Sequence, residues 1–280
     1  MEFVKMHGLG NDFIVTQVAS WAKADALKGY AQALCDRNLG IGADGLVMIG
    51  PDPEWDMFMR IYNPDGSEPE MCGNAIRCVA KYAFEHQWVN DTRIAVRTLA
   101  GIRYPEIILE NNKFSSVRVD MGQPILERSL IPVQGEGPNT NIQLETEFGS
   151  FNINAVSMGN PHCVFFVPDA GAVDPAKDGP RHEHDPLFPE ATNVEFASLT
   201  GPDRLRMRVW ERGTGVTLAC GSGACATAVA AHRRGLTGRR VTLDLDGGTL
   251  VIDWRDEGVW MTGPVALVFA GRLSDAFVKA

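Results

Sequence analysis

Residues 59–81 contain the sequence MRIYNPDGSEPEMCGNAIRCVAK, and residues 207–229 contain a divergent copy of it, MRVWERGTGVTLACGSGACATAV. The two segments keep a constant offset of 148 residues, as Cys72 and Cys220 show. Solenoid repeats have periods of about 20–50 residues, so this spacing indicates a duplicated domain. Each half supplies one cysteine at an equivalent place. The sequence therefore predicts a site between the halves with a thiol on either side.

The repeat divides the chain into two expected domains, residues 1–121 together with 263–280, and residues 122–262. A terminal strand past Gly263 is expected to return to the first half. Apolar periodicity predicts helices over 25–37, 73–86 and 221–234. Residues 168–191 are rich in proline and glycine and are expected to form a long irregular stretch, either a mobile lid or an insertion. Strands are predicted near 2–7, 12–18, 45–49, 55–62, 92–99, 102–110, 114–121, 142–157, 162–167, 193–199 and 204–211.

The composition excludes several classes of protein. The chain has 280 residues, 45% of them hydrophobic, and a net charge of −9 with no basic run. An acidic surface argues against binding to nucleic acid or to anionic membranes. No apolar run reaches the 18 or so residues of a membrane helix, and residues 1–13 lack the features of a signal peptide, so we expect a cytoplasmic protein.

Six cysteines are present, but a reducing compartment argues against a disulfide framework. The spacings C-x5-C and C-x4-C are longer than the usual zinc knuckle, so no metal site is expected. Four of the six are expected to be packed core residues: Cys35, Cys78, Cys163 and Cys225.

Cys72 and Cys220 each precede a glycine that opens a predicted helix. The start of a helix favours an anion, because several backbone N–H groups lack partners there and the macrodipole is positive. Such a position is expected to lower the pKa of a thiol from about 8.5 towards neutrality and to offer donors to a substrate carboxylate. Two such thiols could invert a carbon centre: one removes a proton from one face while the other delivers a proton to the opposite face. The carbanion would then need no pyridoxal cofactor.

Five motifs resemble those of the diaminopimelate epimerase family, within the cofactor-independent amino-acid racemases. They occur in family order: GLGNDF (8–13), NPDGSEPEMCGNAIRC (63–78), SMGNPHCV (157–164), FPEATNVEF (188–196) and ERGTGVTLACGSGACA (211–226). The resemblance implies an α+β (mixed α/β) fold of two pseudo-symmetric domains. Each would be a curled, mostly antiparallel sheet around a central helix, with the active site in the interdomain cleft. It also implies interconversion of LL- and meso-2,6-diaminopimelate for lysine and cell-wall synthesis, with no cofactor, by a homodimer.

The resemblance also implies roles for individual residues. Cys72 and Cys220 would be the catalytic acid/base pair, and His162 and Glu211 would help to set the pKa values of the thiols. Arg212 also has an independent argument, because its planar guanidinium suits a carboxylate. The implied substrate-binding residues are Asn11, Asn63, Gly73, Asn74, Asn160, Asn193, Glu211, Arg212, Gly221 and Ser222.

Some features depart from the family pattern, and other functions compete. Val216 replaces a polar residue of many members, and Phe269 keeps the ring of the residue tied to dimer contact but lacks its hydroxyl. Within the superfamily the alternative is a racemase for a smaller amino acid such as proline. A dithiol redox protein would need both thiols in one short motif, and a cysteine acyl-transfer enzyme leaves the second thiol without a role.

Overall fold

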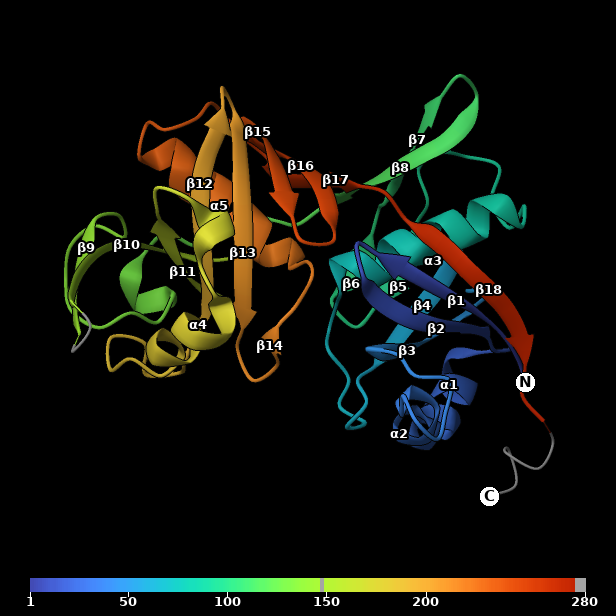
Figure 1. The fold of residues 1–280 in the computed structure, drawn as a ribbon. Coiled ribbons are helices and arrows are strands. Elements are labelled where there is room, and N and C mark those ends of the chain that lie inside the picture. The colour runs from blue at the N-terminus through green and yellow to red at the C-terminus, as the bar shows by residue number, and fades with distance from the viewer. Residues whose placement is uncertain (147–148, 275–280) are drawn as a thin grey trace. The chain divides into compact units, whose positions relative to one another are not determined.

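The computed structural model describes residues 1–146 and 149–274. The chain forms two compact units, Met1–Val119 with Gly263–Ala280, and Asp120–Thr262. Each unit contains a mixed β-sheet and one long buried helix (Figure 1). This agrees with the predicted α+β class.

The first unit is built on a sheet with the strand order β18-β1-β2-β3-β4-β5-β6. The terminal strand β18 pairs antiparallel with β1, which confirms that the end of the chain returns to the first half. Strands β3 and β4 are buried along their whole length, and helices of the unit pack against both strands. The strands are β1 (Glu2–Gly8), β2 (Asn11–Gln17), β3 (Gly45–Gly50), β4 (Met57–Tyr62), β5 (Val96–Thr98), β6 (Gly101–Arg103) and β18 (Ala266–Arg272). The hairpin of β7 (Glu106–Glu110) and β8 (Lys113–Asp120) lies outside this sheet.

Two predicted elements of this unit are interrupted in the structure. The helix predicted over 25–37 is instead α1 (Trp21–Leu27), a 3₁₀ turn η1 (Lys28–Tyr30) and α2 (Ala31–Cys35). Ser20 starts α1 early because its side chain accepts a hydrogen bond from the Lys23 N–H. The strand predicted over 102–110 is divided into β6 and β7, which Tyr104 and Pro105 separate.

Within the second unit, the strands of the sheet run in the order β17-β16-β15-β13-β12-β11-β10-β9. Two 3₁₀ turns, η2 (Arg128–Leu130) and η3 (Ala170–Ala172), lie outside it. The strands are β9 (Ile142–Thr146), β10 (Gly149–Ser157), β11 (Pro161–Phe166), β12 (Asn193–Gly201), β13 (Arg204–Glu211), β15 (Arg240–Leu245), β16 (Gly248–Arg255) and β17 (Gly258–Gly263), and the short β14 (Gly215–Val216) pairs with β13.

The two sheets repeat one pairing pattern. From β1 to β6, successive pairs are antiparallel, parallel, antiparallel, parallel and antiparallel. The same succession runs through β10, β11, β12, β13, β15 and β16. The repeat in the sequence is therefore a repeat of structure, and the predicted pseudo-symmetry is confirmed.

A long helix lies at equivalent places in the two units. α3 (Gly73–Glu85) follows β4 and packs on β1, β2 and β4, whereas α5 (Gly221–Arg233) follows β13 and β14 and packs on β10, β11 and β12. Most residues of both helices are buried, which is typical of a helix enclosed by its domain. Both begin where the sequence predicts.

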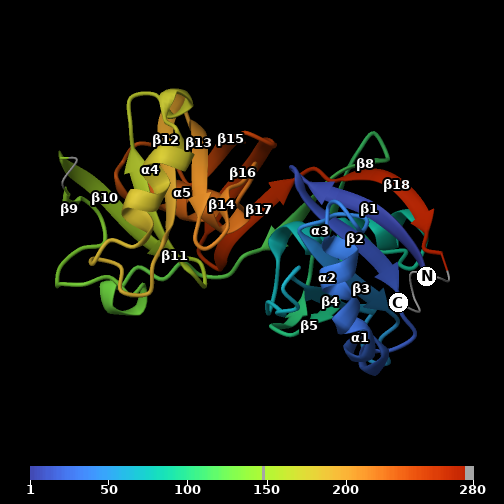
Figure 2. The same cartoon turned by 60° about the horizontal axis from the view of Figure 1, so that its bottom comes forward.

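The stretch 168–191 is not wholly irregular as predicted, because it contains the helix α4 (Pro175–Glu183). Asp174 caps this helix through the Ala176 N–H. α4 packs against β12, β13 and β14, and Figure 2 shows it in front of these strands. A Cβ at Gly179 would lie 2.3 Å from the Trp210 side chain, so the glycine permits this close approach. Tertiary packing therefore stabilises a helix whose sequence is typical of a loop.

Among the helices of the described segments, none has both the length and the apolar character needed to cross a membrane.

Candidate active site

Cys72 is the residue that caps the start of α3. Its backbone is extended, with φ −137° and ψ 117°, and Gly73 is the first helical residue. The residue is partly exposed to solvent. The first backbone N–H groups of α3 have no partner within the helix, so the thiol lies where an anion is stabilised.

Two of the predicted substrate-binding asparagines are joined to each other beside this helix start. Asn74 Nδ2 donates to Asn11 Oδ1 at 2.9 Å, and Asn11 Nδ2 donates to Asp44 Oδ2 at 2.9 Å. Asn74 Oδ1 is buried and accepts no hydrogen bond from the described residues. A donor of a bound molecule would satisfy it. Asp44 was not predicted, because nothing in its local sequence distinguishes it from a surface carboxylate.

A cluster of charged side chains lies next to Asn11. Asp12 lies 2.6 Å from the Lys5 ammonium and 2.8 Å from the Arg37 guanidinium. Burial alone would raise the pKa of the Asp12 carboxyl, but hydrogen bonds from Arg37 and Lys5 outweigh it and lower that pKa to about 2. The cluster therefore keeps Asp12, near the start of β2, ionised.

Asn63 donates hydrogen bonds from its backbone and its side chain within a turn. Its backbone N–H donates to the Ser67 carbonyl at 2.8 Å, and its Nδ2 donates to Ser67 Oγ at 2.9 Å. The structure therefore gives Asn63 a turn function, and its contact with substrate stays a prediction.

Cys220 caps the start of α5 and is only 4% exposed. Its Sγ accepts a hydrogen bond from the Gly223 N–H at 3.4 Å and lies 3.5 Å from Ser222 Oγ. Gly221 is the first helical residue. Gly221 and Ser222 thus lie beside the thiol, and their contact with a substrate stays a prediction.

The pKa of Cys220 differs from the prediction. Burial raises the pKa of the thiol well above its ordinary value, and the nearby carboxylates of Glu211 and Glu195 raise it further. Hydrogen bonds from Ser222 and the Gly223 N–H lower it by less. The prediction that the helix start lowers the pKa is therefore wrong for Cys220, because desolvation and like charge dominate.

Glu211 lies against Cys220, as its predicted role requires. Burial raises the pKa of the Glu211 carboxyl, whereas hydrogen bonds with Thr217 and Cys220 and the charge of His162 lower it. The Thr217 hydroxyl donates to Glu211 Oε1. A carboxyl with a raised pKa in contact with a thiol is suited to exchange a proton with it.

His162 is fully buried between two oxygen acceptors. Its Nδ1 lies 2.6 Å from Glu195 Oε1, and its Nε2 lies 3.0 Å from Asn160 Oδ1. The structure thus brings Asn160 and His162 together. Glu195 was missed, because the alternation in NVEF gives no sign that this carboxylate faces inward.

Two residues hold the turn that follows Glu211. Asn193 Oδ1 accepts from the Arg212 N–H at 3.0 Å, and its Nδ2 donates to the Pro161 carbonyl at 2.8 Å. Glu183, at the end of α4, accepts from Trp210 Nε1 at 2.7 Å and from the Gly213 N–H at 2.8 Å. Glu183 is a second residue that sequence reasoning missed.

The predicted carboxylate-binding arginine lies at the surface. Arg212 is exposed, and its Nη1 donates to the Glu190 carbonyl at 2.9 Å. Its substrate contact stays a prediction.

The other four cysteines are buried, which confirms them as core residues. Burial raises the pKa of Cys35 to about 11 and that of Cys78 to about 12. In residues 1–146 and 149–274, no three His, Cys, Asp or Glu side chains are grouped so as to hold a metal ion.

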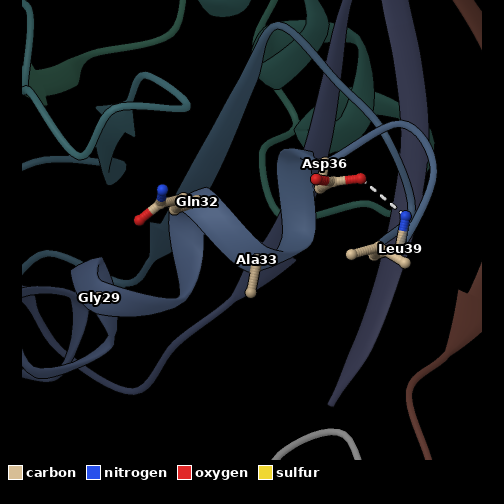
Figure 3. A pocket seen from close by; sticks show the side chains of 5 residues that line it. All are labelled: Gly29, Gln32, Ala33, Asp36 and Leu39. Atoms are coloured by element: carbon tan, nitrogen blue, oxygen red, sulfur yellow. Dashed lines mark hydrogen bonds between the residues drawn. The ribbon is translucent and has the colours of Figure 1, made fainter.

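A surface pocket lies beside α2, lined by Gly29, Gln32, Ala33, Asp36 and Leu39 (Figure 3). Asp36 Oδ1 accepts from the Leu39 N–H at 2.7 Å, so the carboxylate serves the local turn. None of the predicted site residues lines this pocket, and we do not count it as part of the active site.

Comparison with known proteins agrees with these motifs. The model of the family described as "Diaminopimelate epimerase" matches residues 3–127 and 154–268. The chain is 52% identical over 275 residues to the diaminopimelate epimerase of Pelotomaculum thermopropionicum, covering 97% of this chain and 98% of that protein. It is 50% identical over 274 residues to that of Moorella thermoacetica, with 97% and 98% covered.

Solved structures share the fold at low sequence identity. A probable proline racemase from Agrobacterium radiobacter superposes with a TM-score of 0.70 at 15% identity, covering 98% of this chain and 93% of that chain. A hydroxyproline epimerase from Agrobacterium vitis gives 0.69 at 16% identity, covering 97% and 91%. These likenesses concern the fold alone. The family match and the relatives over nearly the full length decide the assignment: the chain belongs to the diaminopimelate epimerase family.

Proposed function

We propose that this chain interconverts LL- and meso-2,6-diaminopimelate without a pyridoxal cofactor, with Cys72 and Cys220 as the residues that transfer the proton. The observation that carries the proposal is the duplicated cysteine. Each is the cap of a buried helix, and the two caps occupy equivalent places in two repeated units. The close relatives named above support diaminopimelate as the substrate over a smaller amino acid.

The chemistry follows from the two helix starts. Inversion at an α-carbon needs a base on one face and an acid on the other, and one thiolate and one thiol supply both. The charge that develops on the substrate carboxylate is stabilised by unpaired N–H groups at a helix start. Gly73, Asn74, Gly221 and Ser222 belong to these two starts, and they are proposed to contact that carboxylate.

The surroundings of Cys220 support the proposal that the two thiols differ in their resting protonation state. A raised pKa keeps Cys220 protonated at neutral pH, so it is the resting acid. Glu211 is proposed to take up and return the Cys220 proton when the reaction runs in the other direction. His162 is proposed to help set the pKa values of the thiols, and Asn11, Asn63, Asn160, Asn193 and Arg212 to bind the two charged ends of the substrate.

The direct test is incubation with LL-diaminopimelate in heavy water. Two thiols on opposite faces give an inverted product that contains solvent deuterium from the first turnover, while recovered substrate stays protonated early in the reaction. Equal early labelling of both isomers would indicate one shared base and would overturn the two-thiol mechanism. Turnover of proline at a comparable rate would favour the smaller-substrate alternative.

The assembly is proposed to be a cytoplasmic homodimer that serves lysine and cell-wall precursor synthesis. Support comes from β18, where Leu267, Val268 and Phe269 expose apolar side chains on the edge strand of a sheet. Light scattering of the native protein and of Phe269→Glu tests it. A monomeric native protein would overturn the proposal.

A further inference from the structure

Glu195 is a buried carboxylate for which the two-thiol mechanism has no role. It lies on β12, and its side chain is 0% exposed. One oxygen, Oε1, lies 2.6 Å from His162 Nδ1, whereas Oε2 is buried and has no hydrogen-bond partner in the described residues. A carboxylate removed from water is strongly unfavourable unless a positive charge accompanies it. The nearest group that can carry this charge is the ring of His162.

The ring of His162 is arranged to hold two protons. Its Nδ1 faces the Glu195 carboxylate and its Nε2 faces Asn160 Oδ1 at 3.0 Å. Both neighbours are acceptors, and only the imidazolium can donate from both nitrogens. The geometry therefore favours a charged His162 paired with a charged Glu195.

This pair lies against the start of α5. A Cβ built on Gly223 would lie 2.6 Å from Glu195 Oε1 and 3.3 Å from Cys220 Sγ, so the carboxylate and the thiol border the same glycine. α5 packs on β11 and β12, which carry His162 and Glu195 (Figure 1).

We propose that Glu195 is a positioning residue for the chemistry at Cys220, because it holds His162 as an imidazolium beside the start of α5. The inference rests on the proposed function, since it gives Glu195 a part in that reaction. The buried pair supplies a fixed positive and negative charge next to the thiol. His162 thereby stays oriented and protonated through the catalytic cycle.

Three other titratable groups face the pair. Burial raises the pKa of Cys163 on β11 and of Cys220 at the start of α5, and nearby carboxylates that include Glu195 raise both further. Burial also raises the pKa of Glu211 on β13, and the charge of His162 opposes that rise. Each of these effects requires proximity to the pair. Loss of the Glu195 charge should therefore change the pKa of both Glu211 and Cys220.

The decisive variant is Glu195→Gln, which keeps the shape and one acceptor oxygen but removes the charge. Its first readout is the ¹⁵N spectrum of the ring nitrogens between pH 5 and 9. In the native protein both nitrogens of His162 are expected to stay protonated over this range. In Glu195→Gln the ring is expected to become neutral within it, because burial then favours the uncharged form.

His182 is the internal control. It is also buried, at 4% exposed, and burial lowers its pKa, yet its Nδ1 has no hydrogen-bond partner among the described atoms. It is expected to be neutral at pH 8 in both proteins. A change in His162 alone identifies a local loss of charge, whereas a change in both rings would indicate a general rearrangement and would overturn the proposal.

The second readout is turnover of LL-diaminopimelate. Glu195→Gln is expected to lower kcat by about 10², the loss typical of a reacting group misplaced by about 1 Å, with a small change in KM. The pH dependence of kcat is expected to gain a limb in the pH range where the ¹⁵N spectrum of the variant shows the ring losing its second proton. A native protein in which His162 is neutral at pH 8, or a variant with native kcat and pH profile, would overturn the proposal.

The two proposals fail in different ways. A native protein that does not turn over diaminopimelate refutes the proposed function, while the protonation of His162 is read from the protein without substrate. Should Glu195→Gln fail to fold, the native spectrum still decides whether the pair is charged.

Discussion

Gly223→Ala is the substitution for which the structure gives the sharpest expectation. The added Cβ would lie 2.6 Å from Glu195 Oε1, and ordinary van der Waals contact begins at 3.4 Å. The first turn of α5 or the carboxylate must therefore move by about 0.8 Å, the difference between these distances. Glu195 is fully buried and bonded to His162, so it cannot swing into solvent. We expect the turn that carries Cys220 to shift.

This shift should affect the stability of the protein and its kcat to different extents. Alanine in a helix is favoured over glycine by about 1 kcal/mol, whereas overpacking costs about 1–3 kcal/mol, so the free energy of unfolding should fall by at most about 2 kcal/mol. A displacement near 1 Å of a reacting group can lower the rate by about 10². We therefore expect kcat to fall by about 10–10² in a protein that remains folded.

The assay is turnover of LL-diaminopimelate, followed by separation of the isomers, together with urea unfolding. Gly29→Ala is the matched control, because nothing lies within 4 Å of a Cβ at that position. It should keep native kcat and stability within about 1 kcal/mol. A Gly223→Ala protein with native kcat would refute the reasoning that the first turn of α5 positions the thiol.

Three further predictions concern the reactivity of the two cysteines, the contribution of Glu183 to stability and the pH dependence of stability. Iodoacetamide at neutral pH should label the partly exposed Cys72 before Cys220, which is buried and has a raised pKa; peptide mapping that finds Cys220 labelled first would contradict this. Glu183→Gln leaves one of two partly buried N–H donors without an acceptor, so urea unfolding should show a loss of about 0.5–1.5 kcal/mol and kcat should fall. Unchanged stability would show that Glu183 does not hold this turn. Asp12 has its pKa lowered from 3.8 to about 2, so its contribution to stability is present above pH 3.8 and is lost as pH falls to 2. Asp12→Asn should thus be less stable than the native protein at pH 6 and equally stable at pH 2, and a constant difference between the two would contradict the ion pairs.

The parts that could be predicted from the sequence are those with a local signal. Both central helices begin where expected, because a cysteine cap followed by glycine and a helical apolar pattern is local information. The return of the terminal strand to the first half was also predicted. By contrast, α4 was missed because Gly179 and Pro180 favour a loop, and only its packing against Trp210 stabilises the helix.

Electrostatic properties were predicted less well than backbone. A helix start alone predicts a lowered pKa for Cys220, but the burial of the thiol and the approach of two carboxylates reverse the direction. Both effects depend on residues that come from segments far apart in the sequence. Glu195 and Glu183 were missed for the same reason, since each is identified only by its partners, His162 in one case and Trp210 in the other.

The pairing of β1 with β18 has a consequence for biosynthesis. β1 ends at residue 8 and β18 begins at residue 266, so 258 residues separate the synthesis of the two strands. At about 5–20 residues per second, the ribosome needs between about 13 and 50 s to cover that distance. During this interval one edge of β1 is unpaired, and most residues of the strand are ones that the folded protein buries. Such an edge can pair with other nascent chains. The yield of folded protein should therefore respond to translation speed and to chaperones that shield sheet edges, although the finished enzyme needs neither.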